Sequence, residues 1–320
     1  MVAAARADAG GFQYGSAADG DNPALELAIW YPSDAPVATK PVGLFEQQVA
    51  YYGPVKGDAL PLVVISHGTG GSAAEHYDTA LALAEAGFVV VAINHTGDNY
   101  KDRGVSFTQR NFTDRSRHVS RVIDFMLNGW KDHSHLDPGK IGIVGHSGGG
   151  ATSLIAIGGI PNFALGPKFC AEHPETWDCQ RVEENNAADA PGDSPATQVS
   201  EGVHDSRLKA AVIAAPAIGY VFEKDALSGV TAPVQLWRAE NDKVTPNQWN
   251  ADLVRDALPV PPEDHLVANA GHFDFLAPCS DALAKVASEI CESAPDFDRA
   301  AFHQDFDKAI VAFFKAQLMQ

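Results

Sequence analysis

A glycine-rich turn around one serine constrains the fold more than any other feature of this sequence. The motif Gly145-His146-Ser147-Gly148-Gly149 follows the apolar run Ile141–Gly145 and opens the helical stretch Gly148–Ile157. A serine held between a strand and a helix adopts strained dihedrals, and side chains at the outer positions of the motif would collide with neighbouring backbone. Glycine at 145 and 149 removes those collisions. The motif therefore predicts a strand–turn–helix unit that exposes the Ser147 hydroxyl above a sheet, although a simple glycine-rich turn is the alternative.

Apolar, β-branched runs alternate with stretches of helical periodicity along most of the chain. Runs that are apolar on both faces are typical of parallel strands buried between helices. The expected strands are Leu25–Tyr31, Leu62–Ser66, Phe88–Asn94, Ile141–Gly145, Leu208–Ala214, Val234–Trp237 and Asp264–Ala268. The expected helices are Ala73–Ala86, Thr113–Leu127, Gly148–Ile157 and a C-terminal helix carrying Phe302, Phe306, Ile310, Phe313 and Phe314. This order predicts an α/β fold with a doubly wound, mostly parallel sheet.

Residues 159–207 interrupt this alternation. The segment is rich in Pro, Gly, Asn and Asp and shows no clear period, and it is too long for a plain connection. We therefore expect a single domain, residues 1–320, in which 159–207 is a lid-like insertion after the helix that follows Ser147. Four apolar side chains of the insertion are candidates for the wall of a binding pocket: Phe163, Leu165, Phe169 and Trp177.

The net charge of the chain excludes some classes of binding partner. The chain has 23 basic and 41 acidic residues, a formal net charge of −18. Such a surface repels phosphate backbones and anionic membrane surfaces, so nucleic-acid binding is not expected. No apolar run reaches the length of about 18 residues that a membrane span needs, so stable membrane insertion is not expected either. The expected partner is a small-molecule substrate, and the oligomeric state is left open.

Two further polar residues follow predicted strands where a nucleophilic serine would need them. Serine is a weak nucleophile that requires a base, which an acid orients. In a sheet of this kind the acid and then the histidine follow the serine along the chain. Asp242 lies just past the strand Val234–Trp237, and His272 lies just past the last strand. The sequence predicts Ser147 as nucleophile, Asp242 as acid and His272 as base, with Glu240 and Asp225 as competing acids.

A second glycine-rich segment, Ser66-His67-Gly68-Thr69-Gly70-Gly71, follows the strand Leu62–Ser66. Glycines let backbone amides face a ligand without covering side chains. We expect the amides of Thr69 and Gly148 to form a two-donor oxyanion hole. A phosphate-binding loop is the alternative, but the segment lacks both the G-K-[ST] ending and the G-x-G-x-x-G spacing.

The other histidines have non-catalytic interpretations. His67 and His146 lie inside the two glycine motifs and are expected to bond nearby backbone. His133 and His135 have no third ligand nearby in sequence, so we expect surface residues and neither a metal nor a cofactor. His95 follows a strand and is expected, with Tyr100, to line the mouth of the site.

The four cysteines indicate in which cellular compartment the protein works. Cys170 and Cys179 are nine residues apart, Cys279 and Cys291 are twelve apart, and neither pair has C-x-x-C spacing. We expect two local disulfides, with four free thiols as the alternative. Disulfides indicate an oxidising compartment, which predicts a periplasmic or secreted protein. The small residues of Met1–Ala9 are typical of a signal-peptide cleavage region, but no apolar segment precedes them, so a cytoplasmic location is the alternative.

Taken together, these features resemble the α/β-hydrolase superfamily over essentially the whole chain. More narrowly, the chain resembles bacterial predicted dienelactone hydrolases related to platelet-activating-factor acetylhydrolases. The stretches that carry this resemblance are Ala28-Ile29-Trp30-Tyr31-Pro32, Val64-Ile65-Ser66-His67-Gly68, Gly145-His146-Ser147-Gly148-Gly149 and Glu240-Asn241-Asp242-Lys243-Val244-Thr245-Pro246. The resemblance implies the same triad and oxyanion donors. True dienelactone hydrolases use a cysteine nucleophile, and this chain has Ser147 instead.

The expected function is hydrolysis of small or short-acyl carboxylic esters through an acyl-enzyme intermediate. Alternatives with the same triad are an amidase, a peptidase, an acyltransferase or a phospholipid deacetylase similar to platelet-activating-factor acetylhydrolase. A non-catalytic binding module of the same fold is the alternative from a different class, and the intact set Ser147, Asp242 and His272 argues against it.

Overall fold

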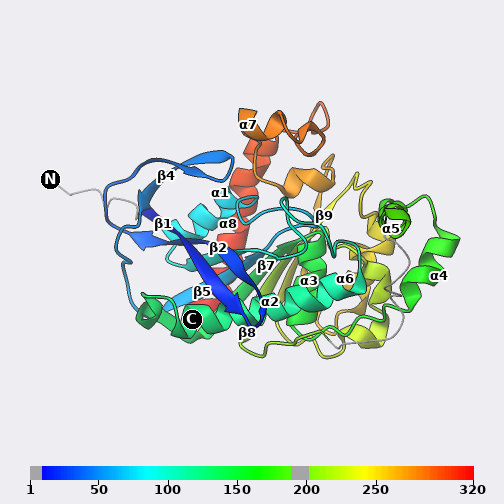
Figure 1. The fold of residues 1–320 in the computed structure, drawn as a ribbon, viewed down its shortest axis with the longest axis horizontal. Helices are drawn as coiled ribbons and strands as arrows, with labels where there is room; N and C mark the ends of the chain where they lie inside the picture. Colours follow the sequence, from blue (N-terminus) through cyan, green and yellow to red (C-terminus); the bar gives the residue numbers. More distant parts are fainter. Residues whose placement is uncertain (1–8, 189–201) are drawn as a thin grey trace.

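A single twisted sheet runs through the centre of the molecule (Figure 1). The computed structural model describes residues 9–188 and 202–320, and within them ten strands pair in the order β10-β9-β8-β7-β5-β6-β2-β1-β4-β3. The strands are β1 (Ala9–Asp19), β2 (Asn22–Ser33), β3 (Ala38–Val42), β4 (Phe45–Tyr51), β5 (Leu60–Ser66), β6 (Val89–Asn94), β7 (Leu136–His146), β8 (Leu208–Ala214), β9 (Val234–Ala239) and β10 (Glu263–Val267).

The sheet has a parallel half and a mostly antiparallel half. From β6 through β5, β7, β8 and β9 to β10, every neighbouring pair is parallel. On the other side, β2 pairs antiparallel with β6 and β1, and β3 pairs antiparallel with β4. The predicted α/β fold with a mostly parallel sheet is therefore confirmed. The sequence analysis missed β1, β3 and β4, because these strands are short or mix glycine and polar residues with the apolar ones.

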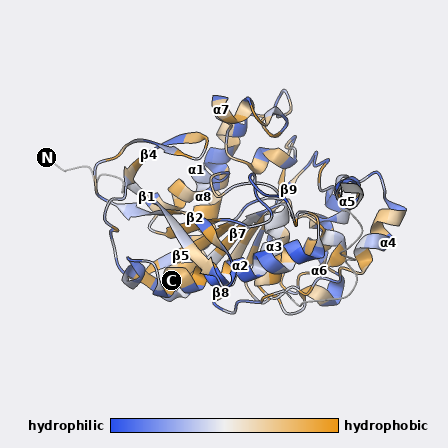
Figure 2. Ribbon diagram, viewed as in Figure 1, coloured by the Kyte–Doolittle hydropathy of each residue, from blue (hydrophilic) through white to orange (hydrophobic). Residues whose placement is uncertain are grey.

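Helices cover both faces of the sheet. The helices of the described residues are α1 (Tyr77–Glu85), α2 (Gln109–Asn128), α3 (Gly148–Ala156), α4 (Leu165–Glu172), α5 (Trp177–Ala188), α6 (Ala251–Ala257), α7 (Asp281–Ala284) and α8 (Arg299–Leu318). Leu83 of α1 and Phe314 of α8 pack with Phe88 in one apolar cluster, whereas Val122 of α2 and Leu154 of α3 belong to a second. Figure 2 shows hydrophobic residues concentrated in the central strands. The two clusters make up the core on the two faces of the sheet.

Two helix starts differ from the prediction. α1 begins at Tyr77 and not at Ala73, because the Glu75 carboxylate accepts hydrogen bonds from the amides of Gly68 and Ser72 and so holds this segment in a turn. α2 begins at Gln109, four residues before the expected start, because the Thr108 hydroxyl caps it by accepting from the Asn111 amide at 3.2 Å.

The segment after α3 contains two helices within its described part. Figure 1 shows α4 and α5 at the edge of the molecule opposite β1 and β4. A Cys170–Cys179 disulfide joins them, and a Cys279–Cys291 disulfide closes the loop that contains α7. Both predicted pairings are thus present in the structure. Residues 189–201 of the predicted insertion lie outside the described residues. Among the helices that are described, none has the length and apolar character needed to cross a bilayer.

Candidate active site

Ser147 sits on a strained turn between β7 and α3. Its φ of 55° and ψ of −119° lie in a region that non-glycine residues rarely occupy. A Cβ on Gly145 would lie 2.1 Å from the Gly149 carbonyl oxygen, and a Cβ on Gly149 would lie 1.9 Å from the Ser66 carbonyl oxygen. Neither position has room for a side chain, which is why the turn requires glycine on both sides of Ser147.

The imidazole of His272 is hydrogen-bonded to the carboxylate of Asp242. His272 Nδ1 donates to Asp242 Oδ2 at 2.8 Å, and both side chains are buried. The other carboxylate oxygen, Oδ1, accepts from the amides of Val244 at 2.9 Å and Thr245 at 2.7 Å. Because Nδ1 donates to Asp242, the neutral ring carries its lone pair on Nε2, the atom that a general base uses.

The two competing acids lie elsewhere. The Glu240 carboxylate accepts from the amide of Asn269 at 2.8 Å, and Asp225 is exposed on a 3-10 turn. Sequence reasoning missed Thr245, whose hydroxyl donates to Asp242 Oδ2 at 3.0 Å and lies 3.1 Å from His272 Nδ1. Its place three residues after an aspartate in a turn was the available signal, since hydroxyl side chains commonly bond there.

Ser147 and His272 line one cavity. Within the described residues no hydrogen bond joins the Ser147 hydroxyl to the His272 ring. Such bonds are often long in the absence of substrate and tighten when it binds. The Ser147 hydroxyl and the His272 imidazole therefore both line this cavity.

Two backbone amides, those of Thr69 and Gly148, lie beside the turn that carries Ser147. A Cβ on Gly148 would lie only 3.3 Å from the Thr69 amide nitrogen, so the loop after β5 approaches the start of α3 closely. Among the described residues, neither the Thr69 nor the Gly148 amide donates a hydrogen bond. Unsatisfied amides at a helix N-terminus attract a negatively charged oxygen.

A buried ion pair holds the loop after β5 from below. Asp98 Oδ1 accepts from the Gly70 amide at 3.0 Å, and Asp98 Oδ2 accepts from Arg115 Nη1 at 2.8 Å. Both charged side chains are completely buried. Arg115 also donates to the Ser66 hydroxyl and to the His67 carbonyl oxygen. Burial lowers the pKa of the Arg115 guanidinium, and the Asp98 carboxylate opposes that effect.

The sequence analysis did not identify this pair. Its signal was an arginine at helical spacing from two apolar residues of α2, three residues after Phe112 and four before Val119. A charged residue at such a spacing predicts a buried partner.

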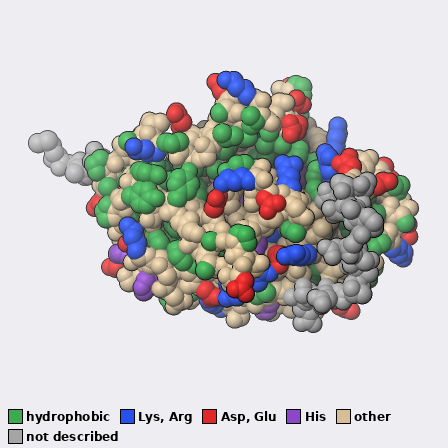
Figure 3. Space-filling model, viewed as in Figure 1, with side chains coloured by type: hydrophobic (Ala, Val, Ile, Leu, Met, Phe, Trp, Pro, Cys, Tyr) green, Lys and Arg blue, Asp and Glu red, His purple; other side chains and the backbone are tan. Residues whose placement is uncertain are grey.

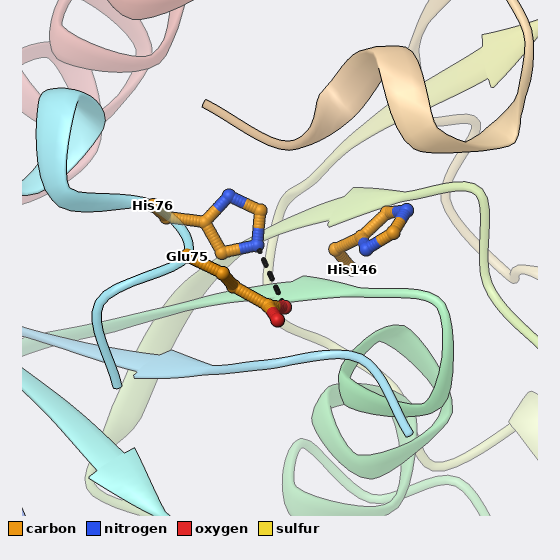
Figure 4. Close-up of side chains that lie close together, drawn as sticks. All are labelled: Glu75, His76 and His146. Atoms are coloured by element: carbon orange, nitrogen blue, oxygen red, sulfur yellow. Dashed lines mark ion pairs between the residues drawn. The ribbon is translucent and has the colours of Figure 1, made fainter. Parts of the chain in front are cut away.

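The loop is also held by Glu75 from the segment before α1. Its Oε1 accepts from the Gly68 amide at 2.6 Å and its Oε2 from the Ser72 amide at 3.3 Å. Burial raises the pKa of this carboxyl, but the neighbouring imidazoles, His76 foremost, outweigh burial and bring it to about 2. Glu75 is therefore an ionised carboxylate under the loop (Figure 4).

The histidines of the two glycine motifs bond backbone, as the sequence predicts. His67 Nδ1 donates to the Gly68 carbonyl oxygen at 2.6 Å, and His146 Nε2 donates to the His272 carbonyl oxygen at 3.1 Å. Burial lowers the pKa of His67 to about 4 and that of His146 well below its usual value. Both rings are consequently neutral near pH 7.

His95 is not at the mouth of the site, contrary to expectation. It is completely buried, lies 2.9 Å from the Ser66 hydroxyl and stacks on His118. The strand end that carries it turns inward beneath the loop after β5, so His95 supports that loop and does not line the cavity.

The cavity has a volume of about 890 Å³ and two unlike walls. Trp177 of α5 contributes the insertion wall, with its ring 5.5 Å from that of Phe107 and the Arg181 guanidinium 5.2 Å away over its face. We call the apolar side chains on the other side the far wall. The far wall consists of Tyr14, Val42, Leu44, Phe45, Leu283, Val286 and Ile290.

The far wall comes from distant parts of the chain. A hydrogen bond from the Ser280 hydroxyl to the Leu44 carbonyl oxygen at 2.6 Å joins the disulfide loop to the turn between β3 and β4. Figure 3 shows hydrophobic side chains over β1 and β4 and around α7. Leu44 is 49% and Val286 71% exposed, so this wall ends in an open apolar rim.

Of the predicted pocket residues, Tyr100 and Trp177 line the cavity. Phe163 instead packs against Phe112 in the core, and Phe169 stacks on Tyr220 with ring centroids 3.8 Å apart. These two aromatic side chains hold α4 and the residues before it against the rest of the protein, and neither lines the cavity.

Asp178, next to Trp177, is a buried carboxyl close to His272 and Asp242. Burial is the main cause that raises its pKa to about 7, and the Asp242 carboxylate adds to that rise while His272 opposes it. The sequence analysis gave it no role, because nothing in its local pattern marks it as buried.

Comparison with known proteins gives one family match and two structural matches. Residues 48–166 match the profile of the dienelactone hydrolase family. A ferulic acid esterase from Streptomyces cinnamoneus is similar in structure, with a TM-score of 0.64 and 17% identity over 99% of this chain and 92% of that one. A dienelactone hydrolase from Anabaena variabilis is similar as well, with a TM-score of 0.55 and 15% identity over 97% and 99% of the two chains. A search of curated proteins returned no match.

Proposed function

We propose that this protein is a serine carboxylic-ester hydrolase of the α/β-hydrolase superfamily. One observation carries the proposal. Ser147, in its strained backbone conformation, lines the same cavity as a His272 ring that is already bonded to the Asp242 carboxylate. Esters and amides are the substrates on which such a set of side chains acts.

In the proposed reaction Ser147 Oγ attacks the acyl carbonyl carbon while His272 Nε2 takes the hydroxyl proton. The Thr69 and Gly148 amides receive the negative charge that develops on the carbonyl oxygen, and each such donor contributes roughly 3 kcal/mol. The imidazolium returns its proton to the leaving alcohol. Water, deprotonated by His272, then attacks the acyl-enzyme and releases the acid and Ser147.

Asp242 stabilises the imidazolium without accepting its proton. Its Oδ1 is occupied by the two amides of Val244 and Thr245, so its position does not depend on His272 alone. Asp98, Arg115 and Glu75 are positioning residues in this scheme, because they hold the loop that carries Thr69.

For the substrate, we propose esters with a short acyl group. The half-buried Trp177 ring limits the acyl side, and Phe107 and Arg181 hold that ring in place. The larger, apolar part of the cavity along the far wall then receives the alcohol portion of the ester. Each methylene that fits on the acyl side contributes about 0.8 kcal/mol, and the first that does not fit loses it.

Turnover of p-nitrophenyl esters across acyl lengths tests this proposal, with Ser147→Ala as the blank. We expect the highest kcat/KM for chains of about two to six carbons. Activity that rises steadily to twelve or sixteen carbons would contradict the acyl limit but not the triad. Equal rates for wild type and Ser147→Ala would contradict the esterase proposal itself.

Amide hydrolysis and acyl transfer would use the same residues. Product analysis separates them: a matched amide substrate reports amidase activity, and a new ester formed in the presence of an added alcohol reports transfer.

We also propose that the protein works outside the cytoplasm. The two disulfides support this, because such bonds persist in oxidising compartments. Intact-mass analysis after alkylation of the native, unreduced protein should find no reactive thiol. Four alkylated cysteines would contradict both the pairing and the location.

A further inference from the structure

We infer that Glu75, His76 and His146 form a binding site for a divalent transition-metal ion of the Zn²⁺ class. Each residue offers one ligand atom, and these atoms lie within 4.8 Å of one another. Figure 4 shows the Glu75 carboxylate and the two imidazole rings converging from the segment before α1 and from the end of β7. The cluster adjoins the proposed triad but contains none of its members.

His146 has a lone pair without a partner. Its Nε2–H donates to the His272 carbonyl oxygen at 3.1 Å, so the neutral ring leaves Nδ1 unprotonated. Nδ1 is buried, and it has no hydrogen-bond partner among the described residues. Metal-binding histidines typically donate their second nitrogen to a backbone carbonyl in this way, which orients the free lone pair.

His76 and Glu75 supply the other two donor atoms. His76 Nε2 lies 3.4 Å from Glu75 Oε1, too far for a well-formed hydrogen bond, and within the described chain this buried nitrogen has no other partner. The Gly68 and Ser72 amides fix the Glu75 carboxylate. His76 Nε2 and His146 Nδ1 thus both lie beside one carboxylate, and neither nitrogen has a hydrogen-bond partner among the described residues. A metal ion is one of the few groups that could bind all three donor atoms.

The space beside the cluster is open. A Cβ on Gly68 would lie 3.3 Å from His146 Nδ1 and 3.6 Å from Glu75 Oε1, so the absence of a side chain there keeps the donor atoms uncovered. Glu75 and His146 also line the 890 Å³ cavity, which gives an ion a path from solvent.

The chemistry of the donors selects the ion. Two imidazole nitrogens and one carboxylate oxygen form a ligand set that Zn²⁺ takes, with a further position free for water. Mg²⁺ and Ca²⁺ prefer oxygen ligands throughout, so this set disfavours them.

A second cluster, Asp78, His303 and Asp307, offers similar residue types but contains a closer histidine–carboxylate pair. His303 Nε2 donates to the Asp274 carbonyl oxygen at 3.0 Å, and His303 Nδ1 lies 2.8 Å from Asp78 Oδ2. Hydrogen bonding and the charges of Asp78 and Asp307 raise the pKa of His303 despite its burial. His303 Nδ1 lies closer to its carboxylate partner than His76 Nε2 does at 3.4 Å, so this cluster serves as the internal control.

The experiment is Zn²⁺ binding to the full-length protein, by isothermal titration calorimetry and by metal analysis after dialysis. We expect one equivalent of Zn²⁺ for wild type and a rise in Tm on binding. His76→Gln should weaken binding by at least about tenfold and abolish the Tm rise. His303→Gln, the matched control, should bind Zn²⁺ as wild type does. His76 lies beside Glu75, which holds the loop after β5, so far-UV circular dichroism and the Tm measured without Zn²⁺ serve as the check on folding of His76→Gln.

Two results would overturn the inference. One is the absence of stoichiometric Zn²⁺ binding by wild type. The other is binding that His303→Gln removes and His76→Gln does not. Co²⁺ in place of Zn²⁺ gives a measurement that needs no variant: we expect the intense visible bands of a four- or five-coordinate site. The weak spectrum of hydrated Co²⁺ would contradict the inference.

Discussion

Two sides of the cavity are built by different means: the side that holds the proposed triad, here called the triad side, and the far wall. On the triad side, short loops at the carboxyl ends of parallel strands are held by dense polar contacts, such as Thr245 to Asp242 and Gly70 to Asp98. The far wall consists of apolar side chains from the antiparallel half of the sheet and the disulfide loop, and one hydrogen bond from Ser280 to Leu44 joins them.

This difference shows which part of the cavity needs exact placement of its atoms and which part does not. A nucleophile, a base and two amides must be placed to within fractions of an ångström, and networks of buried hydrogen bonds provide that. A wall that excludes water needs only suitable shape and apolar character. Substitutions on the triad side should therefore cost orders of magnitude in rate or several kcal/mol in stability, and those on the far wall much less.

The largest effect is expected for the acid. Asp242→Ala should lower kcat by about 10³- to 10⁴-fold, because His272 loses the partner that fixes its tautomer and stabilises its charge. Glu240→Ala is the matched control, since the Glu240 carboxylate accepts from the amide of Asn269. Initial rates with p-nitrophenyl acetate measure both. If Glu240→Ala were the slower variant, the acid would be misassigned.

The next effect tests the support beneath the loop after β5. Arg115→Met should destabilise the fold by about 3–5 kcal/mol, because it leaves the buried Asp98 carboxylate without its countercharge. Arg110→Met on the same helix removes an exposed pair with Asp114 and should cost less than about 1 kcal/mol. Urea unfolding measures the two. Equal losses would mean that the buried pair is no more important than a surface pair.

Much of this architecture was predictable from local sequence. Three signals are local, because each spans only a short stretch of the chain. They are the G-x-S-x-G motif, the strand ends before Asp242 and His272, and the two close cysteine pairs. The far wall was not predictable, because Val42 and Leu283 meet only through long-range packing and neither belongs to a motif. Glu75 and His146 likewise meet across some 70 residues of sequence.

Burial explains the remaining errors. His95 looked like a residue of the site mouth because it follows a strand, yet its ring turns inward to Ser66. Phe163 and Phe169 looked like pocket residues because they are apolar, but an insertion also needs contacts that anchor it to the domain. A strand-end or apolar pattern indicates that a side chain is near a site, and packing decides which way it faces.

A moderate effect should appear at Asp178, where the insertion meets the triad. Its folded pKa of about 7 lies above the reference value of 3.8, so the folded state binds more protons than the unfolded state between those values. This group therefore lowers stability as pH rises from about 4 to about 7. Asp178→Asn should raise Tm relative to wild type at pH 8 and change it little at pH 4. An equal Tm difference at both pH values would contradict the assigned ionisation.

The smallest effects should be at the walls themselves. Val286→Ala, at an exposed position of the far wall, should change kcat/KM for a bulky alcohol less than about threefold and leave the preferred acyl length unchanged. Trp177→Ala should instead extend the preferred acyl length, with a gain of about fourfold for each added methylene that now fits. Kinetics over the ester series measure both. The reverse pattern would place the acyl group along the far wall.

The central claim is that Ser147 is the nucleophile of a working triad, and covalent labelling tests it most directly. A fluorophosphonate probe should add one label per molecule, peptide mapping should locate it on Ser147, and Ser147→Ala should remain unlabelled while keeping the wild-type Tm within about 2 °C. A wild-type protein that resists the probe, or a label that persists in Ser147→Ala, would contradict the account.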